Sequence, residues 1–185
     1  MNEEKSALRR QVLAAEKAMT PAEKATADAA IRRRVLALPA YKTARTVLAF
    51  VGKEDEIDTR PLLAAILASG KRLCVPLCVA AGEMECREIG SLDELQKGSY
   101  GILEPPPTAP RVPPEDIDLA LVPCVTCDHD GHRLGRGGGY YDRFLSAYTG
   151  PAALLSREAL TRPTIPQQPH DRIVKPVVTD KGVFG

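Results

Sequence analysis

Two short apolar runs constrain the fold of this chain more than any other feature. Residues 46–51 read Thr-Val-Leu-Ala-Phe-Val, and residues 117–122 read Ile-Asp-Leu-Ala-Leu-Val. A strand with one face in water alternates apolar and polar residues, whereas a near-continuous apolar run is typical of a strand buried on both faces. Both runs therefore predict inner strands of a parallel sheet that is covered by helices on its two faces.

Helical patterns alternate with these strands. Residues 3–19 carry apolar side chains at helical spacing. The tetrapeptide Thr20-Pro21-Ala22-Glu23 is typical of a helix start, and we expect that helix to end near Leu38, before Pro39. Further helices are predicted at 59–69 and 140–148, and further strands at 71–77, 84–89, 152–155 and 173–179. The alternation predicts an α/β fold with a mostly parallel sheet.

The length of 185 residues favours one domain with one core, so residues 1–185 are interpreted as a single domain. The proline-rich segment 104–114 is compatible with a linker or with a ligand for a proline-binding module. A rigid crossover inside one domain is the preferred interpretation, because neither flank could bury a good core alone.

Charge and hydropathy exclude several classes of protein. The net charge is +1, from 25 basic and 24 acidic residues, which argues against a general nucleic-acid or membrane binder. No apolar run approaches the roughly 18 residues of a membrane-spanning helix. The charged N-terminus lacks the apolar core of a signal peptide, so a cytoplasmic location is expected.

Two cysteine pairs, Cys74-x-x-x-Cys78 and Cys124-x-x-Cys127, could in principle form a zinc site or a redox pair. The chain has five cysteines, an odd number, and no secretion signal, which favours reduced thiols over disulfides. Most of these cysteines lie in or beside apolar runs, where a thiol behaves as a small buried hydrophobe. Burial is therefore the preferred interpretation.

Residues 131–145 form the stretch with the clearest chemistry: Gly-His-Arg-Leu-Gly-Arg-Gly-Gly-Gly-Tyr-Tyr-Asp-Arg-Phe-Leu. Glycine lets the backbone turn through positive φ and approach a ligand, and exposed N–H groups together with arginine favour phosphate. The aromatic residues that follow have the spacing of a helix face, and a helix N-terminus favours phosphate further. Asp142 would repel phosphate unless a cation such as Mg²⁺ lies between them. The stretch therefore predicts a nucleotide-phosphate loop with a metal ligand.

This stretch differs from the two commonest phosphate loops. It lacks the Gly-Lys followed by Ser or Thr of a Walker loop, and Tyr140 stands where the dinucleotide fingerprint has its third glycine. The alternative is a glycine-rich surface connection without a ligand.

Three further positions have weaker signals. Lys5 and Arg9 stand four residues apart on the first helix, where a solvated basic edge is the alternative. Glu56 follows the first apolar strand at the edge where parallel sheets bind ligands, and its alternative is an ordinary solvated loop acid. His170 is interpreted as structural rather than catalytic.

Residues 131–145 closely resemble the signature Gly-x-Arg-Leu-Gly-x-Gly-x-Gly-Tyr-Tyr-Asp-Arg-Phe-Leu of the 5-formyltetrahydrofolate cyclo-ligase family, also called 5,10-methenyltetrahydrofolate synthetases. The resemblance spans nearly the whole chain. It also includes Lys5 with Arg9 and the segments 55–59, 101–105, 116–123, 169–171 and 178–180. Cys124 and Cys127 depart from the family pattern, where a small residue and an aromatic are more usual.

The resemblance implies a three-layer α/β sandwich of the NagB/RpiA/CoA-transferase-like type. It also implies ATP-driven closure of 5-formyltetrahydrofolate to 5,10-methenyltetrahydrofolate, with release of ADP and phosphate. Two acids would hold Mg²⁺, Asp142 and Asp171. ATP would be held by Lys5, Arg9, Arg133, Leu134, Gly135, Arg136, Gly137, Gly138, Gly139, Tyr140 and Tyr141. The folate would contact Val51, Glu56, Arg136, Gly137, Gly138, Gly139 and Tyr140.

For the reaction that the resemblance implies, Arg136 is the chosen candidate for stabilising the transferring phosphoryl group, and Tyr140 for lining the substrate pocket. Two alternatives from other classes stay open. A non-catalytic folate- or nucleotide-binding regulatory module would keep the pocket without turnover. An isomerase or transferase acting on a phosphorylated sugar could use a similar sheet, and fold alone does not separate these functions.

Overall fold

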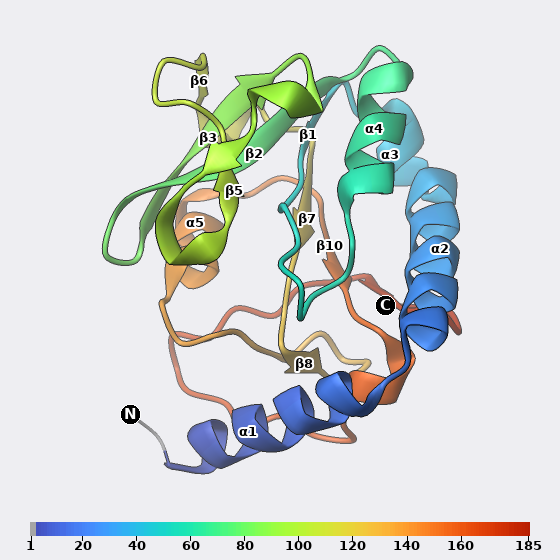
Figure 1. The fold of residues 1–185 in the computed structure, drawn as a ribbon. Helices are drawn as coiled ribbons and strands as arrows, with labels where there is room; N and C mark the ends of the chain where they lie inside the picture. The colour runs from blue at the N-terminus through green and yellow to red at the C-terminus, as the bar shows by residue number, and fades with distance from the viewer. Residues whose placement is uncertain (1–2) are drawn as a thin grey trace.

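The computed structural model describes residues 3–185, and a mostly parallel sheet lies at its centre (Figure 1). Its strands are β1 (Thr46–Leu48), β2 (Arg72–Ala80), β3 (Glu83–Ile89), β6 (Arg111–Val112), β7 (Leu119–Val122), β10 (Ala152–Leu155), β11 (Val177–Val178) and β12 (Val183–Phe184). Within the described chain these eight strands lie in the order β12-β11-β10-β7-β1-β2-β3-β6. Strands β11, β10, β7, β1 and β2 run parallel to one another, whereas β12 pairs antiparallel with β11, β3 with β2, and β6 with β3.

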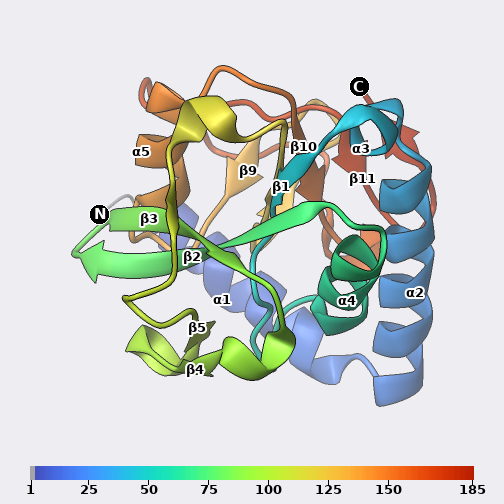
Figure 2. The same cartoon turned by 90° about the horizontal axis from the view of Figure 1, so that it is seen from above.

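Helices cover both faces of this sheet, as Figure 2 shows. The helices are α1 (Glu3–Ala18), α2 (Pro21–Ala37), α3 (Pro39–Thr43), α4 (Arg60–Ala68) and α5 (Tyr140–Ala147). Leu119 and Leu121 of β7 belong to the core cluster that includes residues of α2, α3 and α4. Ala120 and Val122 of the same strand belong to the cluster that includes Phe144 of α5. Because neighbouring residues point to opposite faces, the apolar run fills both layers, which confirms the predicted α/β arrangement.

Helix α1 lies across the carboxyl ends of the parallel strands (Figure 1). Its Val12 is buried against Val125, which follows β7, and Leu160, which follows β10. Two small hairpins complete the described strands: β4 (Gln96–Lys97) with β5 (Leu103–Glu104), and β8 (Thr126–Cys127) with β9 (Arg133–Leu134). Short 3₁₀ helices occur at Leu92–Glu94, Ser99–Gly101, Pro114–Asp116 and Glu158–Leu160.

The predicted start of α2 is confirmed atom by atom. The Thr20 hydroxyl accepts a hydrogen bond from the Glu23 backbone N–H, and the Glu23 carboxylate accepts one from the Thr20 backbone N–H. This capping box satisfies donors that a bare helix terminus leaves unpaired. The helix ends at Ala37, and Pro39 begins the short helix α3, which the sequence pattern did not predict.

Two predicted strands are shorter in the structure. Strand β1 ends at Leu48, although residues 49–51 stay buried and the Ala49 N–H still donates to the Cys74 carbonyl at 2.9 Å. In the segment 173–179, strand pairing is confined to Val177–Val178, and Ile173 is 58% exposed. Apolar composition predicts burial, but pairing depends on neighbouring strands that composition does not show.

The cysteines are free thiols, and Cys74, Cys86 and Cys127 are buried, in line with the preferred interpretation. Burial raises the pKa of Cys74 and of Cys86 to about 12. Over residues 3–185, no helix is both long and apolar enough to cross a membrane.

The two-sided burial of β7 predicts a large cost for truncating it. Leu121 is fully buried, so Leu121→Ala should lower the free energy of unfolding by about 2–5 kcal/mol through the lost contacts and the cavity left behind. Urea unfolding of both proteins measures this. The control Val79→Ala, at a side chain that is 49% exposed, should change it by less than about 0.5 kcal/mol. Similar effects at both positions would contradict the described core.

Candidate functional site

A cleft of about 1140 Å³ opens at the carboxyl edge of the sheet. All the residues that the sequence singled out as ligand contacts line it: Lys5, Arg9, Val51, Glu56, Asp171 and the continuous run 133–142. They come from α1, from the loop after β1, from the stretch that runs from β9 into the first turn of α5, and from the loop before β11. The structure therefore brings together every position predicted to bind ATP, folate or Mg²⁺.

The glycine-rich segment forms one wall of the cleft and leads directly into α5. Gly137 has φ 98° and Gly139 has φ 73°, a left-handed conformation that residues with a Cβ rarely adopt. Gly139 is the N-cap of α5, and within the described chain no side chain caps this helix. The first N–H groups of α5 are therefore available to an anion at the cleft.

Helix α1 supplies two cations to this wall. The Arg9 Nε donates to the Gly135 carbonyl at 2.7 Å, and its guanidinium lies next to Gly137. Burial lowers the pKa of Arg9, and the nearby Asp171 charge partly opposes that change. Lys5 forms an ion pair with Asp171, and both side chains are 8% exposed. The first turns of α1 thus contact two segments that are distant in the sequence.

The two predicted metal ligands are each engaged by a cation. Asp142 is paired with Arg133, and its Oδ1 also accepts a hydrogen bond of 3.4 Å from the Arg172 N–H. Since Arg172 follows Asp171, this contact brings the two acids into one neighbourhood. Burial alone would raise the pKa of Asp171, but hydrogen bonds from Lys5 and the Gln168 N–H, together with the charge of Lys5, lower it below its ordinary value.

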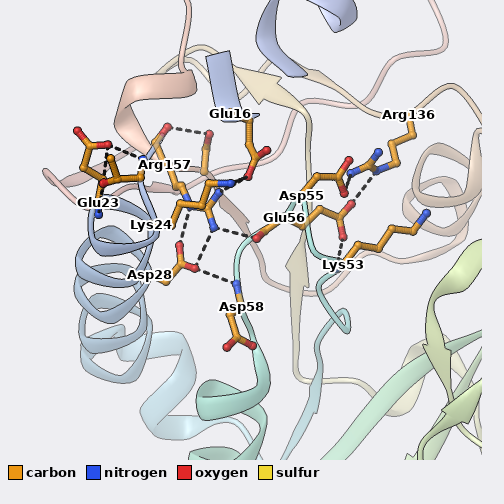
Figure 3. Close-up of polar contacts among 12 residues, drawn as sticks. Glu16, Glu23, Lys24, Asp28, Lys53, Asp55, Glu56, Asp58, Arg136 and Arg157 are labelled. Atoms are coloured by element: carbon orange, nitrogen blue, oxygen red, sulfur yellow. Dashed lines mark hydrogen bonds and ion pairs between the residues drawn. The ribbon is translucent and has the colours of Figure 1, made fainter. Parts of the chain in front are cut away.

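Arg136 reaches across the cleft to the loop after β1 (Figure 3). Its Nε donates to Glu56 Oε1 at 2.8 Å, and its Nη2 donates to Asp55 Oδ1 at 2.7 Å. Burial lowers the pKa of Arg136, but the two carboxylates outweigh burial and raise it. The second Glu56 oxygen accepts from the Lys53 N–H at 3.0 Å. These bonds link the glycine-rich segment to the loop after β1, and both segments carry predicted ligand contacts.

The other end of the cleft is aromatic and apolar. Tyr140 meets Tyr100 edge to face, with ring centroids 6.4 Å apart and the two hydroxyl oxygens at 3.4 Å. This hydrogen bond is the main reason that the pKa of Tyr140 is raised. Further apolar lining comes from Pro76, Met84, Ile102 and Leu103. Such a surface suits a flat ring system better than a phosphate.

Sequence reasoning missed some residues of this lining. Tyr100 is 68% exposed and has φ 57°, an uncommon conformation for a non-glycine residue. Glu104 is 5% exposed, and its Oε1 accepts a hydrogen bond of 3.1 Å from the Cys78 N–H. Burial is the largest cause that raises the pKa of the Cys78 thiol to about 11. In the sequence, the segment 101–105 is marked only by its resemblance to the family. No spacing of apolar or charged residues predicts that it lies beside β2.

Two buried polar atoms of the cleft-lining run have no hydrogen-bond partner among the described residues, Arg133 Nε and Tyr141 Oη. Buried polar groups without partners are uncommon in folded proteins because each loses its hydrogen bonds to water.

Comparisons with known proteins agree on one family. The model of the 5-formyltetrahydrofolate cyclo-ligase family matches residues 1–180. A mitochondrial 5-formyltetrahydrofolate cyclo-ligase of Arabidopsis thaliana is 32% identical, over 97% of this chain and 75% of the relative. The 5-formyltetrahydrofolate cyclo-ligase of Escherichia coli K12 is 32% identical, over 70% of this chain and 72% of the relative.

The solved structures agree as well. The NMR structure of Aquifex aeolicus 5,10-methenyltetrahydrofolate synthetase has a TM-score of 0.86 and 31% identity, covering 97% of this chain and 91% of that chain. A 5,10-methenyltetrahydrofolate synthetase from Mycoplasma pneumoniae has a TM-score of 0.78 at 22% identity, covering 95% of this chain and 98% of that chain, which supports the fold alone.

The Lys5–Asp171 pair predicts a pH-dependent contribution to stability. Because the folded-state pKa of Asp171 is lowered, its contribution is fully present above the unfolded-state value of about 3.9 and is lost as pH falls through the folded value. Asp171→Asn should therefore destabilise the protein by roughly 1–3 kcal/mol at pH 7 and by less at pH 3, measured by urea unfolding. The control Asp130→Asn, at a side chain that is 82% exposed, should have little effect at either pH. An equal loss for Asp171→Asn at both pH values would contradict the role of the carboxylate charge.

Proposed function

This chain belongs to the 5-formyltetrahydrofolate cyclo-ligase family, and from that premise we propose that it closes 5-formyltetrahydrofolate to 5,10-methenyltetrahydrofolate with ATP and Mg²⁺, releasing ADP and phosphate. One observation carries the proposal beyond family membership. The residues predicted for ATP and those predicted for folate line a single cleft, and Arg136 belongs to both sets. A transfer between two substrates requires such a shared site.

The lining of the cleft suits two different substrates. Lys5, Arg9 and Arg133 supply cations to the cleft, which suit the phosphates of ATP. Tyr140, the first residue of α5, belongs to the aromatic lining with Tyr100, which suits the ring system of the folate, and Val51 and Glu56 lie in the loop after β1. The proposal assigns Arg136, which is bonded to Glu56 and Asp55, to the point where the γ-phosphoryl group and the formyl oxygen would meet.

The chemistry explains why ATP is consumed. The oxygen of an N-formyl group is a poor leaving group, so the ring cannot close until that oxygen is activated. Transfer of the γ-phosphoryl group to the formyl oxygen gives a phosphorylated intermediate, an iminium phosphate. The neighbouring folate nitrogen attacks the activated carbon and loses its proton to water, and phosphate leaves with the former formyl oxygen. Such transfers need positioning and charge neutralisation more than a covalent protein nucleophile.

The acids of the cleft fit a magnesium ion only together with phosphate. Within the described chain, no group of three or more His, Cys, Asp or Glu side chains could hold a metal. Mg²⁺ is usually held by one or two carboxylates, phosphate oxygens and water, and Asp142 and Asp171 would supply the carboxylates. The ion would neutralise phosphate charge, while Lys5 and Arg133, the present partners of the two acids, remain beside the phosphates.

Absorbance of the purified protein with 5-formyltetrahydrofolate and Mg²⁺, with and without ATP, tests the proposed function. The product has a conjugated bridge that the substrate lacks, so an ATP-dependent near-ultraviolet band is the expected result. Omission of Mg²⁺ should abolish the band. Folate binding without the band would support a non-catalytic regulatory module, and absence of both binding and closure would overturn the assigned substrate.

Arg136→Ala should lower kcat more than it weakens ATP binding. The guanidinium would contact the phosphoryl group in transfer, whereas Lys5, Arg9 and the loop N–H groups would hold the rest of the nucleotide. Losing one such charged donor lowers kcat by roughly 10²–10³-fold in comparable sites. The control Arg72→Ala, whose arginine pairs with Glu88 on the exposed surface of the sheet, should leave kcat unchanged. Unchanged turnover in Arg136→Ala would remove this role.

Asp142→Asn should weaken ATP binding in the presence of Mg²⁺ and have little effect on binding in its absence. The amide keeps the size of the side chain but loses the charge that a hard cation prefers. Calorimetric titration of ATP with and without Mg²⁺ measures the difference. If the variant responds to Mg²⁺ as strongly as the parent protein, Asp142 is not a metal ligand.

A further inference from the structure

Arg157 is a buried cation that lies behind the cleft. It follows β10, its side chain is 2% exposed, and it lines a small cavity together with Glu56 and Arg136. An arginine this deeply buried is uncommon unless its charge and its donors are matched. The proposed chemistry above makes no use of it.

The guanidinium of Arg157 is held by three segments of the chain (Figure 3). Its Nε and Nη2 donate to the two carboxylate oxygens of Asp28, on α2, at 2.8 and 2.9 Å. Its Nη1 donates to Glu16 Oε1, on α1, at 3.2 Å. Its Nη2 also donates to the backbone carbonyl of Glu56 at 2.8 Å. One side chain therefore ties two helices to the loop that carries a predicted folate contact.

The charges in this cluster balance. Lys24 pairs with Glu16 at 2.6 Å, so Arg157 and Lys24 face Glu16 and Asp28. Burial lowers the pKa of Arg157, but its bonds and charge interactions with Asp28 and Glu16 outweigh burial and raise it, so the guanidinium stays charged. A charge-balanced cluster avoids the cost of an unpaired buried charge, and the planar guanidinium of Arg157 fixes the positions of the groups bonded to it.

The loop between β1 and α4 is anchored at two levels. At its base, the Thr59 hydroxyl donates to the Phe50 carbonyl at 2.7 Å and accepts from the Gly52 N–H at 2.9 Å. At its tip, Arg157 holds the Glu56 carbonyl, and Asp28 Oδ2 accepts from the Asp58 N–H at 2.9 Å. The base fixes where the loop leaves the sheet. The tip contacts fix the backbone on both sides of Ile57.

The Glu56 residue links this cluster to the cleft. Its carbonyl faces Arg157, and its carboxylate faces Arg136 across the cleft (Figure 3). A movement of the carbonyl would displace the carboxylate of the same residue. Lys5 and Arg9 lie on α1 and Arg133 lies on β9, so their positions do not depend on this loop, whereas Arg136 is held by Asp55 and Glu56 of the loop.

We propose that Arg157, together with Asp28, is a positioning pair that sets the place of Glu56 and thereby the affinity for the folate substrate. This inference rests on the proposed function for the identity of the ligand. Arg157 acts through Glu56 and touches neither substrate.

Arg157→Lys tests the proposal, because lysine keeps the charge but lacks the planar fork that grips Asp28 and the Glu56 carbonyl together. We expect KM for 5-formyltetrahydrofolate to rise roughly tenfold with KM for ATP changed by less than about twofold, and kcat to fall as well, because Glu56 also holds Arg136. Calorimetric binding of 5-formyltetrahydrofolate without ATP should weaken by the same factor. Unchanged folate affinity, or an equal change in KM for both substrates, would overturn the proposal.

Arg87→Lys is the matched control. Arg87 is 18% exposed, pairs with Glu85 and donates to the carbonyls of Pro107 and Ala109, so it is also a multiply bonded arginine, but it lies on β3 outside the cleft lining. The same substitution there should leave both KM values unchanged. A general loss of packing would lower the fraction of active protein in either variant, but it would not change KM for one substrate more than KM for the other.

A double-mutant cycle tests the route of the effect. In a Glu56→Gln background, Arg157→Lys should no longer change folate affinity in the same proportion, because the carboxylate it positions is gone. Strict additivity would overturn the assignment to Glu56.

If Arg157→Lys does not fold, Asp28→Asn should show the same selective rise in KM for folate, and a non-selective effect there would overturn the proposal. Failure of the parent protein to close the substrate would count against the proposed function, while the binding measurement would still decide the role of Arg157.

Discussion

Burial of the parallel sheet on both of its faces is the constraint on which the rest of the structure depends. Leu119 and Leu121 fill one layer and Ala120 and Val122 fill the other, so β7 has no face left for polar chemistry. Charged residues must therefore gather where the strands end. The carboxyl edge collects the loops after β1, β7 and β10, and α1 closes across that edge (Figure 1). The cleft is the space that these segments leave between them.

Paired charges dominate this edge. Lys5 is paired with Asp171, Arg133 with Asp142, and Arg136 with Asp55 and Glu56. A phosphate group that binds these cations replaces a carboxylate rather than water alone. The free energy of phosphate binding is then the difference between the new phosphate–cation pair and the carboxylate–cation pair that it replaces. The carboxylates that lose their partners therefore affect the affinity as much as the cations do. In the proposed function Mg²⁺ would be the new partner of Asp142 and Asp171, which would link metal and nucleotide binding.

Depth of burial separates the arginine proposed to meet the substrates from the arginine proposed to position a loop. Arg136 is 36% exposed and faces the cleft, whereas Arg157 is 2% exposed and is tied to α1, α2 and a backbone carbonyl. The exposed arginine can exchange partners at low cost because water compensates while it moves. The buried arginine cannot, because any lost contact leaves a charge without solvent. Glu56 contacts both arginines: its carboxylate accepts a hydrogen bond from Arg136, and its backbone carbonyl accepts one from Arg157.

The sequence alone determined the fold class, the capped start of α2, the turn from the glycine-rich segment into α5 and the chemical type of the cleft residues. Each of these depends on local spacing, such as the four residues from Thr20 to Glu23, or on a long specific motif. The tertiary structure alone decided which distant residues meet. Lys5 and Asp171 are 166 positions apart, and Arg157 reaches Glu16, Asp28 and Glu56 from a segment with no motif of its own. Contacts of this kind arise from the packing of whole elements, whose mutual placement no local pattern encodes.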